Sequence, residues 1–593
     1  MTSYNAPLRD MQFILKEMLE IQTYQDLPGF EEVTEDLIDA ILEEGGKYAR
    51  DVLHPLNKVG DAHGCVRNDD GSVTTPPGFK DAYDAMVESG FTAMAAKTEY
   101  GGQGLPHVLN VAYSEMSSAA NMAFSMYPGL THGAYSAIEA GGSDAQKNTY
   151  LPNLATGKWG GTMNLTEPQC GTDLGLIRTK AVPQADGTYK ITGQKIWISA
   201  GEHDMADNII HLVLARIEGA PEGIKGISLF IVPKYILDEN GEPGARNSLE
   251  CGGLEEKMGI HGNATCVMNY EDATGWLIGD ENKGMRVMFV MMNAARLAVG
   301  VQGLAQAELA YQNAAEFARE RLQSRSLTGP KAPDKPADPI IVHPDVRRML
   351  MDSKAFIEGG RAFAYWTMLF NDLEHLSPDE KVREKASDYM GLMTPVVKSF
   401  LTDKGFKACS DCLQVHGGTG FTKDQGVEQF LRDAKIAMIY EGTNGIQALD
   451  LVGRKLSANA GRSIFGFFKE IDEWCEANSG DEELKPFVDA LGGSKAKLQE
   501  GTTWLMQNGM SDFNNAGAAS HDYLNVFGYT ALTYMWAKMA KIALAKKGSD
   551  PFYDQKLVTG RYFIERLLPE AGSHLEKLKT GAKTMMSLDA EMF

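Results

Sequence analysis

The sequence lacks several features that define common protein classes. Lys and Arg number 57 against 79 Asp and Glu, which leaves a net charge of −22 at pH 7. Nucleic-acid binding needs clustered cations to meet the phosphates, so the composition opposes nucleic acid as the main partner. The first twenty residues lack the basic start and apolar run of a secretory signal. We find no apolar stretch of about 18 residues, and therefore expect no membrane span.

Cysteine is sparse as well. Seven cysteines are scattered over 593 residues, which suits reduced thiols and predicts a cytoplasmic protein. Cys409 and Cys412 have the spacing of a metal or redox pair, but no second pair completes a zinc site and the segment has a helical period. We therefore predict two core thiols and no metal site. No G-x-G-x-x-G follows an expected strand, so a Rossmann fold has no support.

What is present is a change of pattern along the chain. Apolar residues recur at helical spacing over most of residues 1–160. From 161 to 280, short apolar runs alternate with turn residues, and Asp186-Gly187 between two runs predicts a hairpin. The helical period returns over 281–460 and continues over 461–593. These changes predict a mainly α protein with a β middle domain, in four domains with those boundaries.

Two segments of the expected β domain carry groups that could bind a ligand. Residues 163–173 place hydroxyls and a Pro/Gly turn after an apolar strand, which suits either donors to a polar ring edge or a plain turn. Residues 195–199 read Lys-Ile-Trp-Ile-Ser, with an aromatic and a hydroxyl on one face of a strand. That pair suits either a planar ligand or an ordinary core tryptophan.

Two further segments lie in the second helical region. In 414–421 the glycines after a helix permit close approach of a ligand or form a helix cap, and His416 has no second ligand at metal spacing. In 439–445 the carboxylate of Glu441 follows an apolar run and precedes a Gly-containing turn. A Glu in an apolar cleft is a plausible general base, whereas a lone Glu is more often a cap or an ion-pair partner.

In this order and spacing the segments resemble the acyl-CoA dehydrogenase family. Residues 165–173 resemble its first signature, 193–199 its next strand, and 414–420 with 431–435 and 440–443 its closing signature. The resemblance covers about residues 35–455. It implies the acyl-CoA dehydrogenase fold: a helical N-terminal domain, a β-barrel middle domain and a four-helix C-terminal bundle, with FAD at their junction. Residues 461–593 resemble the extra helical domain of the large, very-long-chain-like bacterial branch, which implies a homodimer.

The resemblance also assigns roles to individual residues. Glu441 would be the catalytic base that removes the α proton of an acyl-CoA thioester. The residues implied to bind FAD are Met163, Leu165, Thr166, Gly171, Thr172, Trp197, Ile198, Ser199, Arg321, Gln414, Gly417, Gly418 and Thr443. Those implied to contact the substrate are Thr172, Asn293, Arg296 and Gly442. Among them, Arg321, Gln414, Gly417 and Gly418 would serve the FAD of the neighbouring subunit.

Three departures from the family pattern are visible, the briefest being Gly445, which stands where many members carry Gln. Asn293 stands where the family often has Asp, next to the expected CoA contact. After Arg321 the family usually reads Thr or Ala and then Phe-Gly, whereas this chain reads Leu322-Gln323-Ser324 and continues into a Pro-rich surface loop. We therefore expect the cross-subunit FAD contact to be rebuilt in this protein.

The implied activity is FAD-dependent α,β-dehydrogenation of an acyl-CoA, with electron-transferring flavoprotein as the electron acceptor. Within the large bacterial branch, the resemblance favours conversion of 3-(methylthio)propanoyl-CoA to 3-(methylthio)acryloyl-CoA in dimethylsulfoniopropionate breakdown. The alternative is a general short- or medium-chain acyl-CoA dehydrogenase of β-oxidation. Less favoured are an acyl-CoA oxidase of the same fold and a DNA-binding relative. The nearly balanced charge of 461–593 opposes the last of these.

Overall fold

The computed structural model describes residues 2–509 and 511–593. Its contacts divide the chain into two compact units. Unit 1 comprises Met1–Glu43, His107–Glu115 and Val299–Phe593, and unit 2 comprises Glu44–Pro106 and Met116–Ala298. Each unit combines segments that are distant in the sequence, and the four-domain division stays a prediction.

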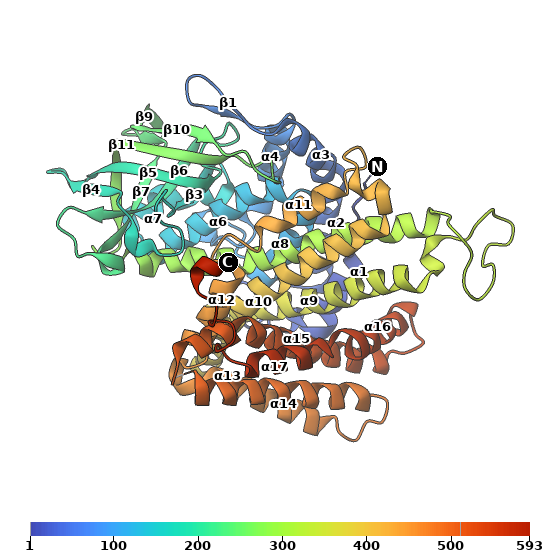
Figure 1. Ribbon diagram of the computed structural model, residues 1–593. Helices are drawn as coiled ribbons and strands as arrows, with labels where there is room; N and C mark the ends of the chain where they lie inside the picture. Colours follow the sequence, from blue (N-terminus) through green and yellow to red (C-terminus); the bar gives the residue numbers. More distant parts are fainter. Residues whose placement is uncertain (1, 510) are drawn as a thin grey trace. The chain divides into compact units, whose positions relative to one another are not determined.

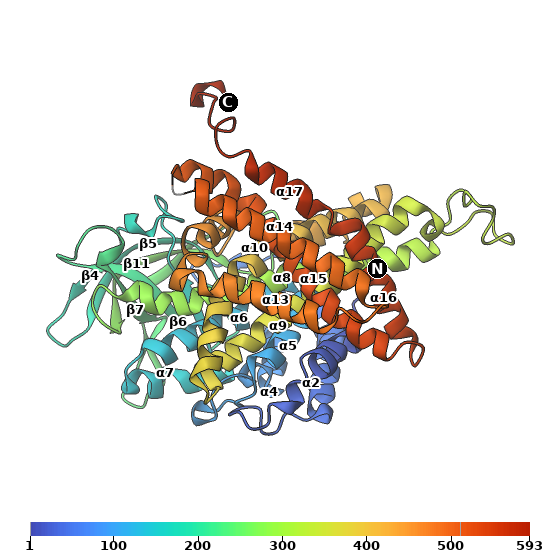
Figure 2. The ribbon, with the colours of Figure 1, turned by 90° about the horizontal axis from the view of Figure 1, so that it is seen from below.

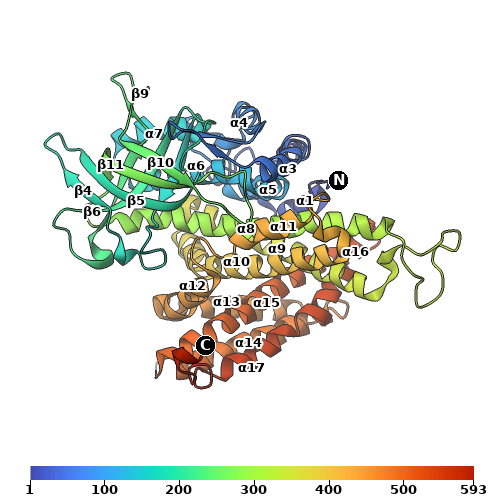
Figure 3. The same cartoon turned by 45° about the horizontal axis from the view of Figure 1, so that its top comes forward.

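Unit 2 is built on a seven-stranded sheet whose strands are labelled in Figure 1, and Figure 3 shows the sheet from another side. The strands are β3 (Trp159–Asn164), β4 (Lys180–Pro183), β5 (Tyr189–Ser199), β6 (Asn208–Ile217), β7 (Ile227–Pro233), β10 (Leu249–Leu254) and β11 (Thr265–Ile278). Strand β11 pairs with β5, β5 with β4, β4 with β6, β6 with β7, and β7 again with β11. Five strands therefore close into a ring, which confirms the expected β-barrel.

The barrel follows from the local sequence. Every residue of β7 and nearly every residue of β6 is buried, which is the pattern of strands covered on both faces. One cover is helix α6 (Met122–Gly141), which packs on β3. A Cβ at Gly161 of β3 would lie 2.5 Å from the Cβ of Ala134, so glycine is what allows this close approach. The expected hairpin is present, with Gly187 at φ 84° between β4 and β5.

The bundle in unit 1 is formed by long helices. Its helices are α8 (Gly284–Glu320, which begins in unit 2), α9 (Pro344–Leu376), α10 (Glu380–Val415), α11 (Glu428–Ile436) and α12 (Asn444–Asp450). Helix α10 packs on α9, α11 and α12. Where α8 crosses α10, a Cβ on Gly303 would lie 2.7 Å from the Cα of Thr402. The two backbones therefore touch, and a larger residue would push them apart.

Helix α8 corrects one expectation from the sequence. Its length and composition match those of a membrane span, with a mean hydropathy of 1.4 over 18 residues. The expectation that no such stretch exists was therefore wrong. However, 56% of that window is buried inside the protein. We interpret α8 as a core helix whose apolar surface is covered by protein.

Five further helices follow the bundle, and Figure 2 shows them together. They are α13 (Arg462–Ala477), α14 (Lys485–Asn508), α15 (Phe513–Ala545), α16 (Pro551–Tyr562) and α17 (Glu570–Lys579). Helix α15 packs on α14, α16 and α17 on one side and on α9, α10 and α12 on the other. The indole of Trp536 on α15 donates a hydrogen bond to Ala355 O on α9 (3.2 Å). The extra helical domain is thus part of the body of unit 1.

Buried ion pairs join these helices to the rest of unit 1. Arg361 on α9 binds Glu115 (2.7 Å), Glu308 (2.6 Å) and Asp10. Lys556 on α16 binds Glu358 (2.7 Å) and Asp10. These residues are almost fully buried, so removing one member would leave its partners charged and unpaired in the interior. The network ties the start of the chain and the extra domain to the bundle.

Asp372 gives the stability of unit 1 a defined pH dependence. Its carboxylate accepts hydrogen bonds from the backbone N–H groups of His107 (2.8 Å) and Val108 (2.9 Å). Burial nevertheless raises its pKa to about 7. Between its ordinary value and about 7, the folded state holds a proton that the unfolded state has lost, so stability falls as pH rises through that window. We expect Asp372→Asn to remove on the order of 3 kcal/mol of this fall, measured by chemical unfolding at pH 5 and pH 8.

Candidate active site

The loop after β3 carries the first group of expected FAD residues. Thr166 is partly buried, and its carbonyl accepts a hydrogen bond from Ile196 N of β5 (3.0 Å). Glu167 and Cys170 exchange two backbone hydrogen bonds and close a tight turn. Gly171 and Thr172 follow that turn and are exposed. The structure therefore places the loop against β5, the strand that bears the second group.

A buried ion pair fixes that placement. Lys195 of β5 is fully buried, and its ammonium donates to Glu167 Oε1 (2.8 Å) and to Leu165 O (3.0 Å). Thr179 also donates to Oε1, while Oε2 accepts from Arg178 N. Desolvation opposes the charge of Glu167, but Lys195 and these donors lower its pKa to about 2. The carboxylate stays ionised and holds the loop to the strand.

Trp197 stands on a β-bulge beside this pair. Cys266 pairs with Ile198 and Met268 pairs with Lys195, so two residues of β5 face a single residue of β11. Trp197 has φ 60°, in the left-handed region that costs energy for a bulky residue. Its side chain is 60% exposed, whereas Ile198 is buried and Ser199 is partly exposed. The bulge thus turns the indole outward, and Ser199, two residues further on, is partly accessible.

These residues fit FAD. An exposed indole offers an apolar face, and the hydroxyls of Thr166, Thr172 and Ser199 offer donors and acceptors. A flat heteroaromatic ring with polar edges needs that combination of groups. Because its side chain is 60% exposed, Trp197 is not an ordinary core tryptophan, the alternative left open by the sequence.

Glu441 lies in a constrained loop of unit 1 between α11 and α12. It has φ 58°, and Gly442 after it has φ 85°, so two successive residues are left-handed. Thr443 then caps α12 with its hydroxyl, which accepts from Ile446 N (3.4 Å). A non-glycine residue held in this region is a sign of function, because the surrounding structure must offset the strain.

Several side chains hold the Glu441 loop. Gln447 donates to Glu441 O (2.9 Å), and Lys398 of α10 donates to Gly442 O (2.8 Å). Tyr440 binds Gln302 of α8 through its hydroxyl. Burial, and then the charge of Glu441, raise the pKa of Tyr440, so its phenol stays protonated. The backbone on both sides of Glu441 is therefore fixed to the helices of the bundle.

Substitution of the fully buried Lys398 tests whether these contacts position the Glu441 loop. Besides Gly442 O, Lys398 donates to the side chain of Asn444 (2.8 Å). We expect Lys398→Met to lower kcat about tenfold, because the loop that positions Glu441 loses its anchor. FAD content should be unchanged. Lys404→Met, on the same helix but bound to Glu570 at the surface, is the control. Equal kcat values for the two variants would contradict the positioning role.

The group expected to serve a neighbouring subunit is also assembled within unit 1. Arg321 follows the last residue of α8, and Gln414 lies in the last turn of α10; both are exposed. Phe317 of α8 packs on His416 after α10, with ring centroids 4.7 Å apart. Gly417 has φ 59°, and open space surrounds Gly418. The structure thus brings these four expected residues to adjacent helix ends, with His416 in a packing role.

The chain after Arg321 forms a compact loop, as its unusual sequence suggested. Leu322 bridges to Pro339, and Ile340 N donates back to Arg321 O (2.8 Å). The buried carboxylate of Asp338 accepts from the backbone N–H groups of Ser326, Lys331 and Ala332 and from Arg325. The loop is therefore organised around the Asp338 carboxylate.

The expected CoA contacts lie on α8, one turn apart. Asn293 is exposed, but Arg296 is only 6% exposed. Arg296 is therefore presented to the interior, and Asn293 is the more accessible of the two. Their contact with substrate stays a prediction, as does that of Gly442 and Thr172.

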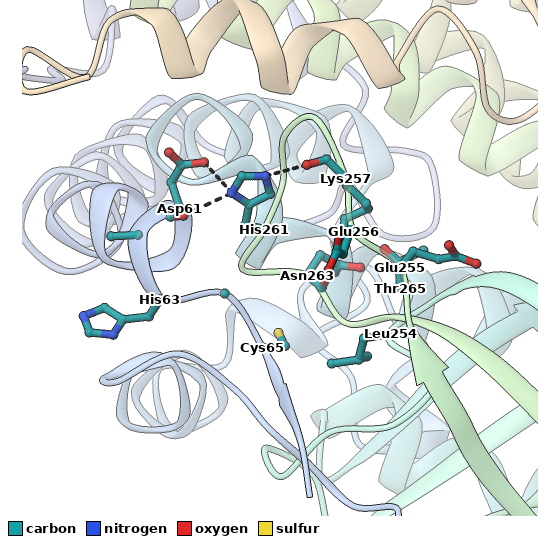
Figure 4. A pocket seen from close by; sticks show the side chains of 12 residues that line it. Asp61, His63, Cys65, Leu254, Glu255, Glu256, Lys257, His261, Asn263 and Thr265 are labelled. Atoms are coloured by element: carbon teal, nitrogen blue, oxygen red, sulfur yellow. Dashed lines mark hydrogen bonds and ion pairs between the residues drawn. The ribbon is translucent and has the colours of Figure 1, made fainter. Parts of the chain in front are cut away.

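A separate cavity of about 300 Å³ lies in unit 2 and is shown in Figure 4. His261 lies beside it, between Asp61 (3.0 Å) and the carbonyl of Lys257 (2.7 Å). None of the residues that line it belongs to the expected site. Among the described residues, no group of three His, Cys, Asp or Glu side chains could hold a metal ion.

The sequence reasoning missed the supporting residues Glu167, Lys195, Lys398, Asn444 and Gln447. A signal existed for the two lysines. Lys195 directly precedes the apolar residues 196–198 of a strand, and Lys398 stands between the apolar pairs 396–397 and 400–401 of a helix. A cation in such a run is almost never buried without a partner.

The chain belongs to the acyl-CoA dehydrogenase family. Residues 67–158, 162–273 and 282–456 match the models described as its N-terminal, middle and C-terminal domains. Residues 467–589 match a model described as acetyl-CoA dehydrogenase C-terminal like. The protein is thus an acyl-CoA dehydrogenase, an FAD-dependent oxidoreductase.

Three relatives that match over their full length are named for particular acyl-CoA substrates. The chain is 42% identical over 589 residues to 3-methylmercaptopropionyl-CoA dehydrogenase of Ruegeria pomeroyi, covering 99% of each chain. It is 34% identical to a butyryl-CoA dehydrogenase of Syntrophomonas wolfei (100% and 99% covered). It is also 34% identical to the broad-specificity linear acyl-CoA dehydrogenase FadE5 of Mycobacterium tuberculosis (100% of each).

Solved structures share the fold. Caenorhabditis elegans ACDH-11 in complex with C11-CoA matches with a TM-score of 0.79 at 19% identity, over 96% of this chain and 92% of that one. An acyl-CoA dehydrogenase of Bacillus anthracis complexed with FAD matches with a TM-score of 0.76 at 22% identity, over 98% and 93%. Both matches include the extra helical domain, because they cover nearly the whole chain.

Proposed function

We propose that this enzyme converts 3-(methylthio)propanoyl-CoA to 3-(methylthio)acryloyl-CoA in dimethylsulfoniopropionate breakdown. The observation that carries the proposal is the 42% identity, over 99% of both chains, to a dehydrogenase named for that thioester. A short- or medium-chain acyl-CoA is the second candidate, because two 34% relatives are named for butyryl-CoA and for linear acyl-CoAs.

Glu441 is the proposed base. The α C–H bond breaks, its proton goes to the Glu441 carboxylate, and its electron pair forms the new Cα–Cβ double bond as hydride leaves Cβ. When bound, FAD supplies the two-electron oxidation. The left-handed backbone at Glu441, held by Gln447 and Lys398, supports this role because it fixes the backbone that carries the carboxylate before the substrate arrives.

The remaining site residues divide between two proposed roles. Met163, Leu165, Thr166, Gly171, Thr172, Trp197, Ile198, Ser199 and Thr443 would hold the flavin of the same subunit. Along α10, Gln414 stands sixteen residues after Lys398, which corresponds to about 24 Å. That separation supports assignment of Gln414 and its neighbours to the FAD of a second subunit. We propose a homodimer on this basis.

Electron-transferring flavoprotein is the proposed electron acceptor, as in the family. A cytoplasmic location is proposed because all seven cysteines are free thiols. An oxidase would instead pass electrons to O₂. Hydrogen peroxide released on adding substrate in air would favour the oxidase, and its absence would favour the dehydrogenase.

Substrate choice is tested by kcat/KM for 3-(methylthio)propanoyl-CoA beside butanoyl-, pentanoyl-, octanoyl- and palmitoyl-CoA, with an artificial electron acceptor. We expect the thioether substrate to exceed the isosteric straight-chain thioester, pentanoyl-CoA. Equal or higher kcat/KM for pentanoyl- or butanoyl-CoA would support the second candidate.

A further inference from the structure

The cavity of about 300 Å³ in unit 2 is bordered by two segments that are distant in the sequence (Figure 4). One is the end of helix α3 (His54–His63) with the two residues after it, and the other runs from the end of β10 to the start of β11. Cavities that bind small molecules begin at about this volume and combine apolar walls with a few polar groups. Leu254 and Cys65 supply apolar wall here. The polar groups therefore decide which ligand fits.

Two buried polar atoms on the wall have no partner. Asn263 is 0% exposed, and its amide nitrogen donates to Ala123 O of α6 (3.1 Å). Its amide oxygen turns away from α6 and has no hydrogen-bond partner among the described residues, and the same holds for the hydroxyl of Thr265, which is 7% exposed. Buried polar side chains are nearly always hydrogen-bonded. An amide oxygen can only accept and a hydroxyl can also accept, so the two atoms indicate a ligand that donates.

Two carboxylates that line the same cavity are also unpaired. Glu255 is partly exposed and Glu256 is exposed, and over the residues that the structure describes neither carboxylate forms an ion pair or a hydrogen bond. The basic groups beside them are engaged elsewhere. The ammonium of Lys257 donates to Asn263 O (3.1 Å), and both ring nitrogens of His261 face protein oxygens. The unpaired groups of the wall thus favour a ligand that is a cation.

Other kinds of ligand or chemistry fit this wall less well. Burial raises the pKa of the Cys65 thiol to about 11, which opposes a nucleophilic role. No three His, Cys, Asp or Glu side chains converge on a metal position anywhere in the described residues. An anion would be repelled by Glu255 and Glu256. The ring of His63 points away from the other lining side chains (Figure 4).

We propose that this cavity binds a small aliphatic diamine. One ammonium group would donate to the amide oxygen of Asn263 and the hydroxyl of Thr265. The hydrocarbon chain would lie along Leu254, and the second ammonium group would balance Glu255 and Glu256. Hydrogen bonds from a charged donor are roughly twice as strong as those between neutral groups, so these acceptors suit an ammonium better than a hydroxyl. The site is separate from the proposed acyl-CoA site and does not depend on which thioester is turned over.

Thr265 also connects the cavity to a strand that carries expected FAD residues. It is the partner of Ser199 across the pair of β11 and β5. Side chains that stand directly opposite each other in such a pair lie about 5 Å apart. Substitutions in the cavity therefore act close to the flavin residues. For that reason FAD content is measured for every variant, and FAD-containing enzyme is used for each titration.

Isothermal titration of the full FAD-containing enzyme with 1,4-diaminobutane is the first test. We expect one saturable site per chain. 4-Aminobutan-1-ol, which keeps one cation and one hydroxyl donor, should bind at least about tenfold more weakly. 1-Butanol, which has no charge, should bind at least about 100-fold more weakly than the diamine. Butanoate should not bind.

Substitution of the two carboxylates tests the charged end of the site. Glu255→Gln/Glu256→Gln should lower the affinity for 1,4-diaminobutane at least about tenfold. The matched control is Glu250→Gln/Glu271→Gln, which removes two exposed carboxylates from β10 and β11 that do not line the cavity. Because solvent and salt screen such distant charges, the control should stay within about twofold of the wild type.

Thr265→Val separates binding from folding. Val keeps the shape of Thr but lacks the hydroxyl, which has no partner within the described residues. Its removal should therefore leave the free energy of unfolding unchanged or raise it, while the affinity for 1,4-diaminobutane falls about tenfold. A hydroxyl that serves only the fold would give lower stability and unchanged affinity, which would contradict the proposal.

Three further results would overturn it. The first is the absence of saturable binding of 1,4-diaminobutane. The second is an equal loss of affinity in Glu255→Gln/Glu256→Gln and its control, because the diamine would then respond only to the net charge of −22. The third is Mg²⁺ binding as tightly as the diamine. Acyl-CoA turnover, measured in parallel, reports on the proposed reaction, so failure of either proposal is recognised separately.

Discussion

Replacing Glu441 with Gln is expected to leave a folded, yellow protein that turns over acyl-CoA at least about 100-fold more slowly, and up to about 10,000-fold. The amide has the size and hydrogen-bonding shape of the carboxylate but cannot accept the α proton. The hydrogen bonds from Gln447 and Lys398 that hold the loop go to the backbone carbonyls of Glu441 and Gly442, which the substitution keeps. The loss should therefore appear in kcat rather than in FAD content or stability.

The matched control is Glu476→Gln, which removes the same charge from an exposed position on α13. Stopped-flow reduction of bound FAD by substrate isolates the chemical step from reoxidation. A Glu441→Gln enzyme that reduces its FAD at a near-normal rate would show that another group takes the proton.

The second large effect is expected at Lys195. Lys195→Met leaves the buried Glu167 carboxylate without its cation, and loss of one partner of a buried pair costs about 3–5 kcal/mol. The Thr166 loop and the Trp197 strand would also lose their link, so we expect the variant to release FAD. Lys190→Met on the same strand is the control, because Lys190 donates to the hydroxyl of Thr274 (3.0 Å) and forms no ion pair within the part of the chain that the structure describes. Unfolding in urea and FAD per chain measure both effects.

The double variant Lys195→Met/Glu167→Gln separates charge from packing. With both charges removed, we expect less destabilisation than for Lys195→Met alone, since no uncompensated ion remains. The pKa of Glu167 is lowered to about 2, so its stabilising contribution is complete above its ordinary value of 4.5 and is lost as pH falls through about 2. The wild type should lose this stability in acid, and the double variant should not.

Much of the fold was predictable because it depends on local pattern. The short apolar runs between turn residues predicted the barrel strands, and the Asp186-Gly187 hairpin is where the turn residues placed it. The order and spacing of the motifs predicted that the chain belongs to the family. The burial of α8 was not predictable in the same way. Its apolar composition matches a membrane span, and only its packing against the rest of the protein identifies it as a core helix.

The supporting residues of the site depend on contacts between distant positions. Lys195 meets a carboxylate 28 residues earlier, and Lys398 meets a carbonyl 44 residues later. The outward turn of Trp197 results from a bulge against β11, which strand alternation alone does not indicate. The left-handed conformation of Glu441 likewise follows from the bonds of Lys398 and Gln447 to the loop. The motifs therefore predicted which residues carry the chemistry. The residues that hold them in place were found only in the structure.

Anaerobic addition of 3-(methylthio)propanoyl-CoA to the purified flavoprotein is the most direct test of the central claim. The account predicts rapid bleaching of the visible FAD absorbance in the wild type, faster than with pentanoyl-CoA, and little bleaching in Glu441→Gln. Absence of bleaching by any acyl-CoA in a protein that contains FAD, or equal bleaching in Glu441→Gln, would contradict it.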